Sequence, residues 1–170
     1  EVILNWSEYP VYSMIIDESA KNQWKNEFKY LDSIELSWIT YNSDGLKIKG
    51  MMARPKKDGK YPCIIYNRGG NRDFGALKLD QRSLNLAKLA SHGYIVIASQ
   101  YRGNCGSEGQ EEFGGKDVND VLNLMDVLGE IEEADTTRVG MYGWSRGGMM
   151  TYLALVKSNK IKTAIVGGAV

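Results

Sequence analysis

Gly143-Trp144-Ser145-Arg146-Gly147 has the pattern Gly-x-Ser-x-Gly, and its flanks decide how the chain is interpreted. Residues 138–142 before it are predicted to form a short buried strand, and residues 149–155 after it a helix. A sharp turn from strand to helix strains the backbone of its central serine and lifts the hydroxyl above the sheet. The pattern alone recurs by chance, so the flanks carry the inference. Ser145 is therefore a candidate nucleophile.

A serine hydroxyl is a weak nucleophile until a base takes its proton. No Asp, Glu or His follows Ser145, and the single histidine, His92, lies upstream. His92 ends a predicted helix that leads into a strand, so we expect it at the end of the sheet opposite Ser145, in a structural or solvated role. Three interpretations of Ser145 stay open: a nucleophile in a longer protein of which this is the N-terminal part, a nucleophile completed by another chain, and a relic turn in a non-catalytic protein.

The composition is that of a soluble globular protein of one domain, with 170 residues, 43% of them hydrophobic. Lys plus Arg and Asp plus Glu are equal at 21 each, so no net field favours nucleic acid or an anionic membrane as a partner. No apolar run approaches the ~20 residues of a membrane helix. Cys63 and Cys105 make no disulfide framework or zinc site and are expected as free thiols. No residues have metal-ligand spacing, and the glycines around Ser145 do not spell a dinucleotide motif, so no cofactor is expected.

The remaining sequence predicts strands that alternate with helices. Residues 1–32 are expected as an N-terminal extension with a short helix near 18–31. Segments 33–41 and 46–54 flank Asn42-Ser43-Asp44-Gly45, and Asp-Gly between alternating segments predicts a hairpin. Buried strands follow at 62–66, 94–98, 138–142 and 163–166, and helices at 77–92, from about 117, and at 149–155. This alternation predicts right-handed βαβ units and a mostly parallel sheet.

Four stretches resemble, in order, the catalytic domain of the prolyl oligopeptidase family of serine peptidases. They are Tyr66-Asn67-Arg68-Gly69-Gly70, Gly93-Tyr94-Ile95-Val96-Ile97-Ala98, Tyr101-Arg102-Gly103 with its Gly-rich continuation, and Gly143-Trp144-Ser145-Arg146-Gly147-Gly148. The resemblance covers roughly residues 33–170. It implies a three-layer α/β-hydrolase fold with a mostly parallel sheet, an N-terminal antiparallel hairpin and the C-terminal part missing. Esterases and dienelactone-hydrolase-like enzymes share much of the pattern.

The resemblance also implies roles for individual residues. Ser145 matches the nucleophile, and the backbone N–H of Arg146 matches one oxyanion donor. The second donor is expected near Arg68 or Gly69, where the family usually reads His-Gly-Gly or Tyr-Gly-Gly; the Arg68 guanidinium would be a charged donor of different reach. The family's Asp and His follow the serine on later loops, so this domain is incomplete in the chain. We expect the 170 residues alone to hydrolyse activated esters far more slowly than a complete enzyme.

Arg102 lies in the Gly-rich loop after the strand at 94–98, where it either contacts substrate or pins the loop through an ion pair with Asp117 or Asp120. We favour the ion pair. Three arginines, Arg68, Arg72 and Arg146, could together favour acidic or carboxylate-ended substrates. Scattered surface arginines without such a role are commoner.

The leading hypothesis is a serine peptidase that acts on peptides through an acyl-enzyme. An esterase or thioesterase of the same fold is the runner-up, and a non-catalytic binding or assembly protein is the alternative from another class. The substrate is expected to be a peptide or ester and the location cytoplasmic, although the chain begins at Glu1 without Met, so a removed leader or a trimmed sequence is expected. The last strand, 161–166, would form an open apolar edge, so we expect self-association or pairing with a C-terminal portion.

Overall fold

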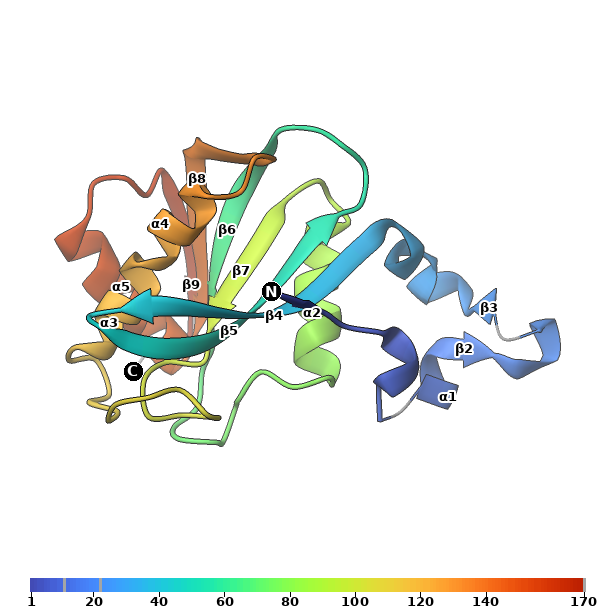
Figure 1. Ribbon diagram of the computed structural model, residues 1–170, viewed down its shortest axis with the longest axis horizontal. Coiled ribbons are helices and arrows are strands. Elements are labelled where there is room, and N and C mark those ends of the chain that lie inside the picture. Colours follow the sequence, from blue (N-terminus) through green and yellow to red (C-terminus); the bar gives the residue numbers. More distant parts are fainter. Residues whose placement is uncertain (11, 22, 170) are drawn as a thin grey trace.

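The computed structural model describes residues 1–10, 12–21 and 23–169, and a seven-stranded sheet runs through it in the order β1-β4-β5-β7-β6-β8-β9 (Figure 1). The strands are β1 (Val2–Ile3), β4 (Ile34–Ser43), β5 (Leu46–Pro55), β6 (Tyr61–Asn67), β7 (Ile95–Ser99), β8 (Ala134–Trp144) and β9 (Thr163–Gly167). Neighbours pair antiparallel from β1 through β7, and β7, β6, β8 and β9 pair parallel. The predicted parallel βαβ part and the antiparallel N-terminal hairpin are both confirmed.

The hairpin of β4 and β5 is joined by a two-residue turn. Asp44 and Gly45 have φ angles of 53° and 81°, the left-handed values that a tight hairpin turn of this kind needs at both positions. The side chain of Asn42 accepts the Gly45 N–H at 3.0 Å and fixes the turn. The strands then pair from Ser43 opposite Leu46 to Ile34 opposite Pro55.

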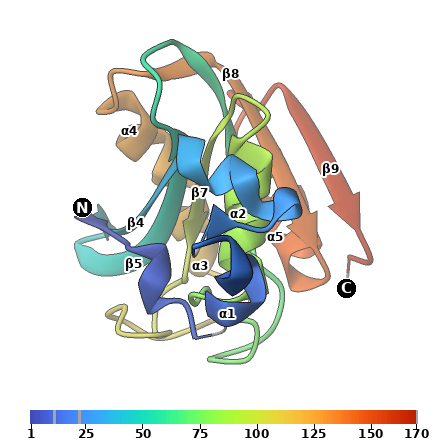
Figure 2. The same cartoon turned by 90° about the vertical axis from the view of Figure 1, so that its right-hand side faces the viewer.

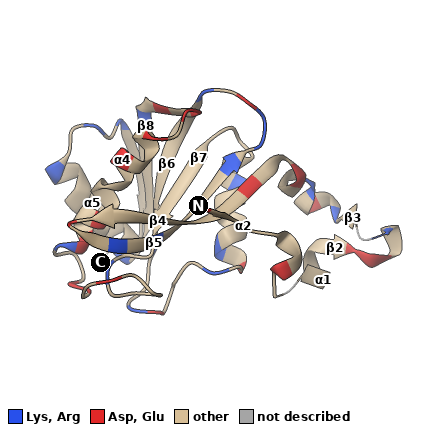
Figure 3. Ribbon diagram, viewed as in Figure 1, with Lys and Arg blue, Asp and Glu red and all other residues tan. Residues whose placement is uncertain are grey.

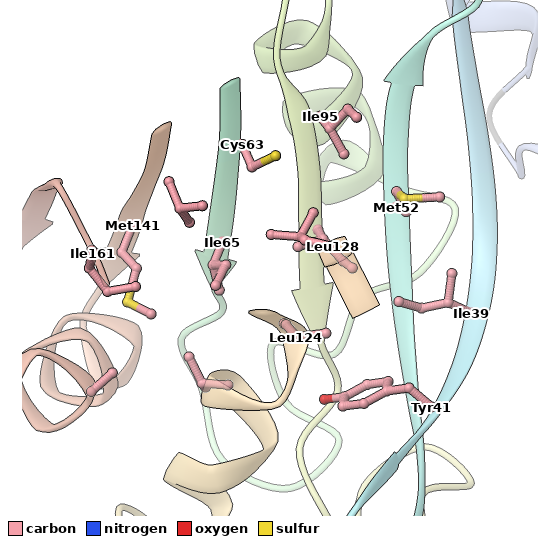
Figure 4. Packing of buried hydrophobic residues seen from close by; sticks show 14 of the residues in the cluster. Ile39, Tyr41, Met52, Cys63, Ile65, Ile95, Leu124, Leu128, Met141 and Ile161 are labelled. Carbon is pink, nitrogen blue, oxygen red and sulfur yellow. The ribbon is translucent and has the colours of Figure 1, made fainter. Parts of the chain in front are cut away.

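Helices cover both faces of the sheet and bury the apolar side chains that its central strands carry on both sides. On β7, Ile95 and Ile97 enter the core beneath α3 (Asp117–Leu122), α4 (Leu124–Gly129) and α5 (Arg146–Lys157). The alternate residues Val96 and Ala98 face α2 (Gln81–Ala90) and the N-terminal segments. Figure 4 shows the first core, with Ile95 of β7 between Cys63 and Ile65 of β6 on one side and Met52 of β5 on the other.

The predicted helix near 18–31 is wrong. The described residues there form a 3₁₀ turn η2 (Glu18–Ala20), strand β3 (Gln23–Trp24) and a 3₁₀ helix η3 (Asn26–Ser33), while residue 22 lies outside the described residues. Phe28 and Leu31 are three residues apart, a spacing that suits the three residues per turn of a 3₁₀ helix as well as an α-helix. The preceding segment contains η1 (Trp6–Glu8), α1 (Tyr12–Ile15; Figure 2) and β2 (Ile16–Asp17). Strand β2 pairs antiparallel with β3.

Two helix boundaries also differ from the predictions. The helix expected over 77–92 begins only at Gln81, because the Asp80 side chain accepts the Arg82 N–H at 2.8 Å and caps it. The helix expected from Asp117 is assigned as two segments, α3 and α4, that meet at Asn123. The side chain of Asn123 donates to Ser43 Oγ at 2.8 Å and so ties this junction to the hairpin.

Candidate active site

Ser145 occupies a single-residue turn between the end of β8 and the start of α5. Its backbone has φ 56° and ψ −127°, a conformation that side-chain-bearing residues rarely adopt and that costs about 1–3 kcal/mol. Two backbone hydrogen bonds hold the turn. The Ser145 N–H donates to the carbonyl oxygen of Gly167 in β9 at 2.9 Å, and the Ser145 carbonyl oxygen accepts the Gly148 N–H of α5 at 2.8 Å. The predicted tight turn between a parallel strand and a helix is confirmed.

The glycines of the pattern are needed because backbones meet closely around this turn. A Cβ on Gly143 would overlap the carbonyl oxygen of Gly147 and stand 2.5 Å from Thr151 Oγ1. A Cβ on Gly147 would overlap the carbonyl of Asn67 at the end of β6. The pattern Gly-x-Ser-x-Gly therefore reports close packing of α5 against the ends of β6 and β8.

Two backbone N–H groups near the Ser145 turn, those of Gly69 and Arg146, are candidates for binding a ligand. The loop after β6 lies against the turn, so that a Cβ on Gly69 would be 3.0 Å from Trp144 O and 3.5 Å from Ser145 Cβ. Neither the Gly69 N–H nor the Arg146 N–H, at the first position of α5, has an acceptor among the described residues. N–H groups at a helix start carry partial positive charge and suit a developing oxyanion.

The Arg68 side chain does not point into this region. It is 1% exposed and donates to carbonyl oxygens: Gln100 O at 2.7 Å, Arg72 O at 3.1 Å and Gly69 O at 3.2 Å. Burial lowers the pKa of Arg68. The guanidinium of Arg68 is thus occupied by these carbonyl groups, and the structure does not support it as a charged oxyanion donor. Only the backbone N–H of Arg68 remains a candidate donor.

The Arg146 side chain turns inward, away from solvent. It is 1% exposed, donates to Asp117 Oδ2 at 2.5 Å and forms a second ion pair with Glu111. Arg68 and Arg146 are therefore not surface charges, and the hypothesis that they attract acidic substrates is wrong because both guanidiniums are buried and bind groups inside the protein. The buried Nε of Arg146 has no hydrogen-bond partner among the described residues. Arg72 is exposed. Basic and acidic residues are interspersed along the ribbon (Figure 3).

Arg102 pins its loop, as predicted, through Asp120. Its guanidinium lies 2.7 Å from the fully buried Asp120 carboxylate and 2.7 Å from Asp44 in the hairpin turn. The hydrogen bonds to Asp120 raise the pKa of Arg102. Asp117, the other partner considered, pairs with Arg146 instead.

His92 is exposed and follows α2, just before β7 begins. Ser145 follows the last residue of β8. Since β7, β6 and β8 run parallel, the two residues lie at opposite ends of the sheet, and the predicted separation is confirmed. Cys63 and Cys105 are free thiols, as expected. Over the described ranges no group of side chains has the make-up of a metal site, and no helix is long and apolar enough to cross a membrane.

Sequence reasoning missed Glu111, which accepts from Arg146, from the Arg72 N–H at 3.1 Å and from Asn104 Nδ2 at 3.4 Å. The only signal was a cluster of acidic residues after the Gly-rich loop, which is more often a solvated surface. A polar cavity of about 550 Å³ opens beside Glu111, lined also by Arg72, Asp73 and Phe113.

Known proteins of similar sequence and structure include peptidases and other hydrolases. Residues 44–169 match the X-Pro dipeptidyl-peptidase (S15) family. The chain is 36% identical over 124 residues to the uncharacterized peptidase YtmA of Bacillus subtilis, covering 73% of this chain and 47% of that protein. It is 29% identical to human dipeptidyl peptidase 8 over 144 residues, 75% of this chain and 16% of that protein.

Solved structures agree on the fold. The acylaminoacyl peptidase of Pyrococcus horikoshii superposes with a TM-score of 0.69 at 28% identity, over 85% of this chain and 24% of that chain. A putative dienelactone hydrolase from Klebsiella pneumoniae shares the fold, with a TM-score of 0.64 at 20% identity over 80% of this chain and 60% of that one. The chain thus spans half or less of the length of the matched peptidases. It has the α/β-hydrolase fold and belongs to the X-Pro dipeptidyl-peptidase (S15) family.

Proposed function

We propose that the chain carries the nucleophile and the oxyanion-binding groups of a serine peptidase. The observation that carries the proposal is the strained backbone of Ser145, with φ 56° and ψ −127°, beside the open N–H groups of Arg146 and Gly69. Ser145 Oγ attacks the peptide carbonyl and gives its proton to a base. The tetrahedral oxyanion accepts hydrogen bonds from the two N–H groups, and its collapse expels the amine, which takes up the proton, and leaves an acyl-serine that water hydrolyses.

We infer that a residue outside these 170 supplies the base. His92 is the sole histidine and lies at the far end of the sheet, and the sequence after Ser145 holds no Asp, Glu or His. A downstream base in a longer chain, or a base from a partner chain, satisfies the proposal equally. Without it the oxyanion groups alone give residual catalysis, about 10³–10⁴-fold over water in comparable enzymes.

We further propose that the substrates are peptides, of the kind cleaved by enzymes of the prolyl oligopeptidase type. Support comes from the names of the relatives, which include dipeptidyl peptidases and an acylaminoacyl peptidase.

The test is run on the natural protein over the full length of its reading frame. We expect a fluorophosphonate probe to label Ser145, as located by peptide mapping, and Ser145→Ala to abolish both the label and the cleavage of dipeptidyl and acyl-aminoacyl anilides. Ser158→Ala, a serine beyond the other end of α5, is the matched control and keeps the label. Absence of label on Ser145 would contradict the proposal and favour a binding protein, whereas label with ester but no peptide cleavage would favour an esterase.

A further inference from the structure

The two proposed oxyanion donors belong to different elements, so their separation depends on what fixes the loop after β6 against α5. The Arg146 N–H is fixed by the helix. The Gly69 N–H is carried by a loop whose backbone doubles back on itself: Gly70 and Gly75 have φ angles of 82° and 81°. A Cβ on Gly75 would stand 2.6 Å from Gly69 O, so the loop closes tightly on itself. Backbone packing holds the start of the loop against α5, since a Cβ on Gly147 would overlap Asn67 O and stand 3.0 Å from Arg68 O. Beyond Gly69, side chains make the connection to the helix.

Arg68 holds the loop from its inner side. Its guanidinium gathers carbonyls from Gly69 and Arg72 in the loop and from Gln100 at the end of β7. The guanidinium also lies 4.9 Å from the centroid of the Tyr101 ring, whose hydroxyl donates to Arg68 O at 2.9 Å. These contacts shape the loop but do not reach α5.

Arg146 and Glu111 connect the loop to α5. Arg146 Nη1 lies 3.3 Å from Gly70 O, directly after Gly69, and is ion-paired to Glu111. Glu111 in turn accepts the backbone N–H of Arg72 at 3.1 Å and 3.4 Å. The residue after the candidate nucleophile is thus joined to both sides of the bend at residues 70–72. The Glu111 carboxylate is the bridge.

The charges explain why Glu111 is ionised in this place. Arg68 and Arg146 approach the same Tyr101 ring, at 4.9 Å and 4.8 Å, and their positive charges are balanced by Glu111 and the fully buried Asp117. Burial acts to raise the pKa of Glu111, but the Arg146 guanidinium and the hydrogen bonds from the Arg72 N–H and Asn104 together lower that pKa below its ordinary value. Neutralising Glu111 would leave an excess buried positive charge and remove the acceptor of the Arg72 N–H.

We propose that Glu111 is a positioning residue, which through Arg146 and the backbone of Arg72 sets the place of the Gly69 N–H relative to the Arg146 N–H. The inference rests on the proposed function, because the two N–H groups are assigned there as the oxyanion site. Glu111 itself touches neither Ser145 nor the oxyanion. A shift of the loop by ~1 Å would weaken transition-state stabilisation without abolishing substrate binding.

The experiment compares Glu111→Gln with Glu112→Gln in the natural protein. Gln keeps the shape of the side chain and removes its charge. Glu112 is an exposed neighbour on the same loop that accepts the Lys116 N–H at 2.8 Å and takes no part in the bridge, so it is the matched control. The measurements are kcat and KM with an anilide substrate, and the inhibition constant of a peptidyl boronic acid, a tetrahedral mimic.

We expect Glu111→Gln to lower kcat about 10–100-fold, to weaken the boronate by a similar factor and to leave KM within about threefold, since displacement of an oxyanion donor costs up to ~10²–10³. Hydrogen exchange of the amides at 69–75 should accelerate in Glu111→Gln and stay unchanged in Glu112→Gln. A purely structural role would lower the melting temperature and leave boronate affinity intact, which would overturn the proposal.

The failures of the two proposals are distinguishable. If wild-type protein cleaves the substrate through Ser145 but Glu111→Gln keeps its kcat, the positioning role is wrong and the proposed function stands. If the wild type shows neither cleavage nor Ser145 labelling, the proposed function is wrong and the positioning role falls with it. Equal loss in both variants would also overturn the role of Glu111.

Discussion

Gly147 lies so close to Asn67 that a Cβ on the glycine would overlap the asparagine carbonyl oxygen. The contact joins the first turn of α5 to the end of β6, and no flexible side chain is available to move aside. We expect Gly147→Ala to lower the free energy of unfolding by about 1–3 kcal/mol, the usual cost of overpacking, as measured by urea denaturation. Gly129→Ala, whose Cβ would meet nothing within 4 Å, is the control and should be neutral or slightly stabilising.

Ser145 stores backbone strain that a glycine would relieve. At φ 56° and ψ −127° the serine costs about 1–3 kcal/mol, whereas glycine there loses about 0.5–1 kcal/mol through its freedom in the unfolded chain. We expect Ser145→Gly to raise the free energy of unfolding by about 1 kcal/mol while abolishing fluorophosphonate labelling. Ser158→Gly, at φ −142° and ψ 132°, should only destabilise. A destabilised Ser145→Gly would argue against strain at this turn.

Removing one partner of the ion pair between Arg102 and Asp120 should lower the free energy of unfolding strongly. Asp120 is fully buried and also accepts Ser43 Oγ at 2.6 Å, so Asp120→Asn leaves Arg102 without its inner partner. We expect a loss of about 3–5 kcal/mol in denaturant unfolding, softened by the remaining contact with Asp44. Asp126→Asn, an exposed carboxylate on α4, should change stability by less than about 0.5 kcal/mol.

Burial raises the pKa of the Cys63 thiol to about 11, from an ordinary value of 9.0. The unfolded chain therefore loses this proton at a lower pH than the folded chain, and stability is intact below pH 9 and falls as pH rises from about 9 to 11. Cys63→Ala should show a shallower fall of stability than wild type over that window, measured by urea unfolding at several pH values.

The two free thiols should differ in reactivity. At pH 8 a thiol reagent should modify the half-buried Cys105 well before the buried Cys63; equal rates would contradict the assigned burial.

The edge of the sheet at β9 is expected to promote self-association of this chain. Among the described residues β9 pairs only with β8, and Ile165 is 66% exposed. An apolar groove of about 290 Å³ runs beside it, lined also by Ile64, Leu89 and Met141. We expect light scattering to detect dimers or larger species, and Ile165→Lys to reduce them at least severalfold. Val156 of α5 is 87% exposed, and Val156→Lys, the control, should leave the amount of these species unchanged. A stable wild-type monomer would disprove the expectation.

The sequence predicted the site's backbone better than its charges. Apolar runs placed β6, β7 and β8, and the flanks of Ser145 placed its turn, because these depend on neighbouring residues. Arg68 and Arg146 were interpreted as surface cations, and the structure buries both. Nothing local to an arginine says whether a carboxylate from another loop will meet it.

By itself the sequence determined the Asp44-Gly45 hairpin turn, the alternation of buried strands with helices and the sharp turn at Ser145. Each follows from backbone preferences or from the periodicity of side chains over a few residues. Only the tertiary structure decided that Asp120 binds Arg102 while Asp117 and Glu111 bind Arg146, and that the N-terminal segment forms 3₁₀ turns. The pairing of buried charges depends on which loops the packed sheet brings together, and that information is spread over the whole chain rather than held in any one stretch.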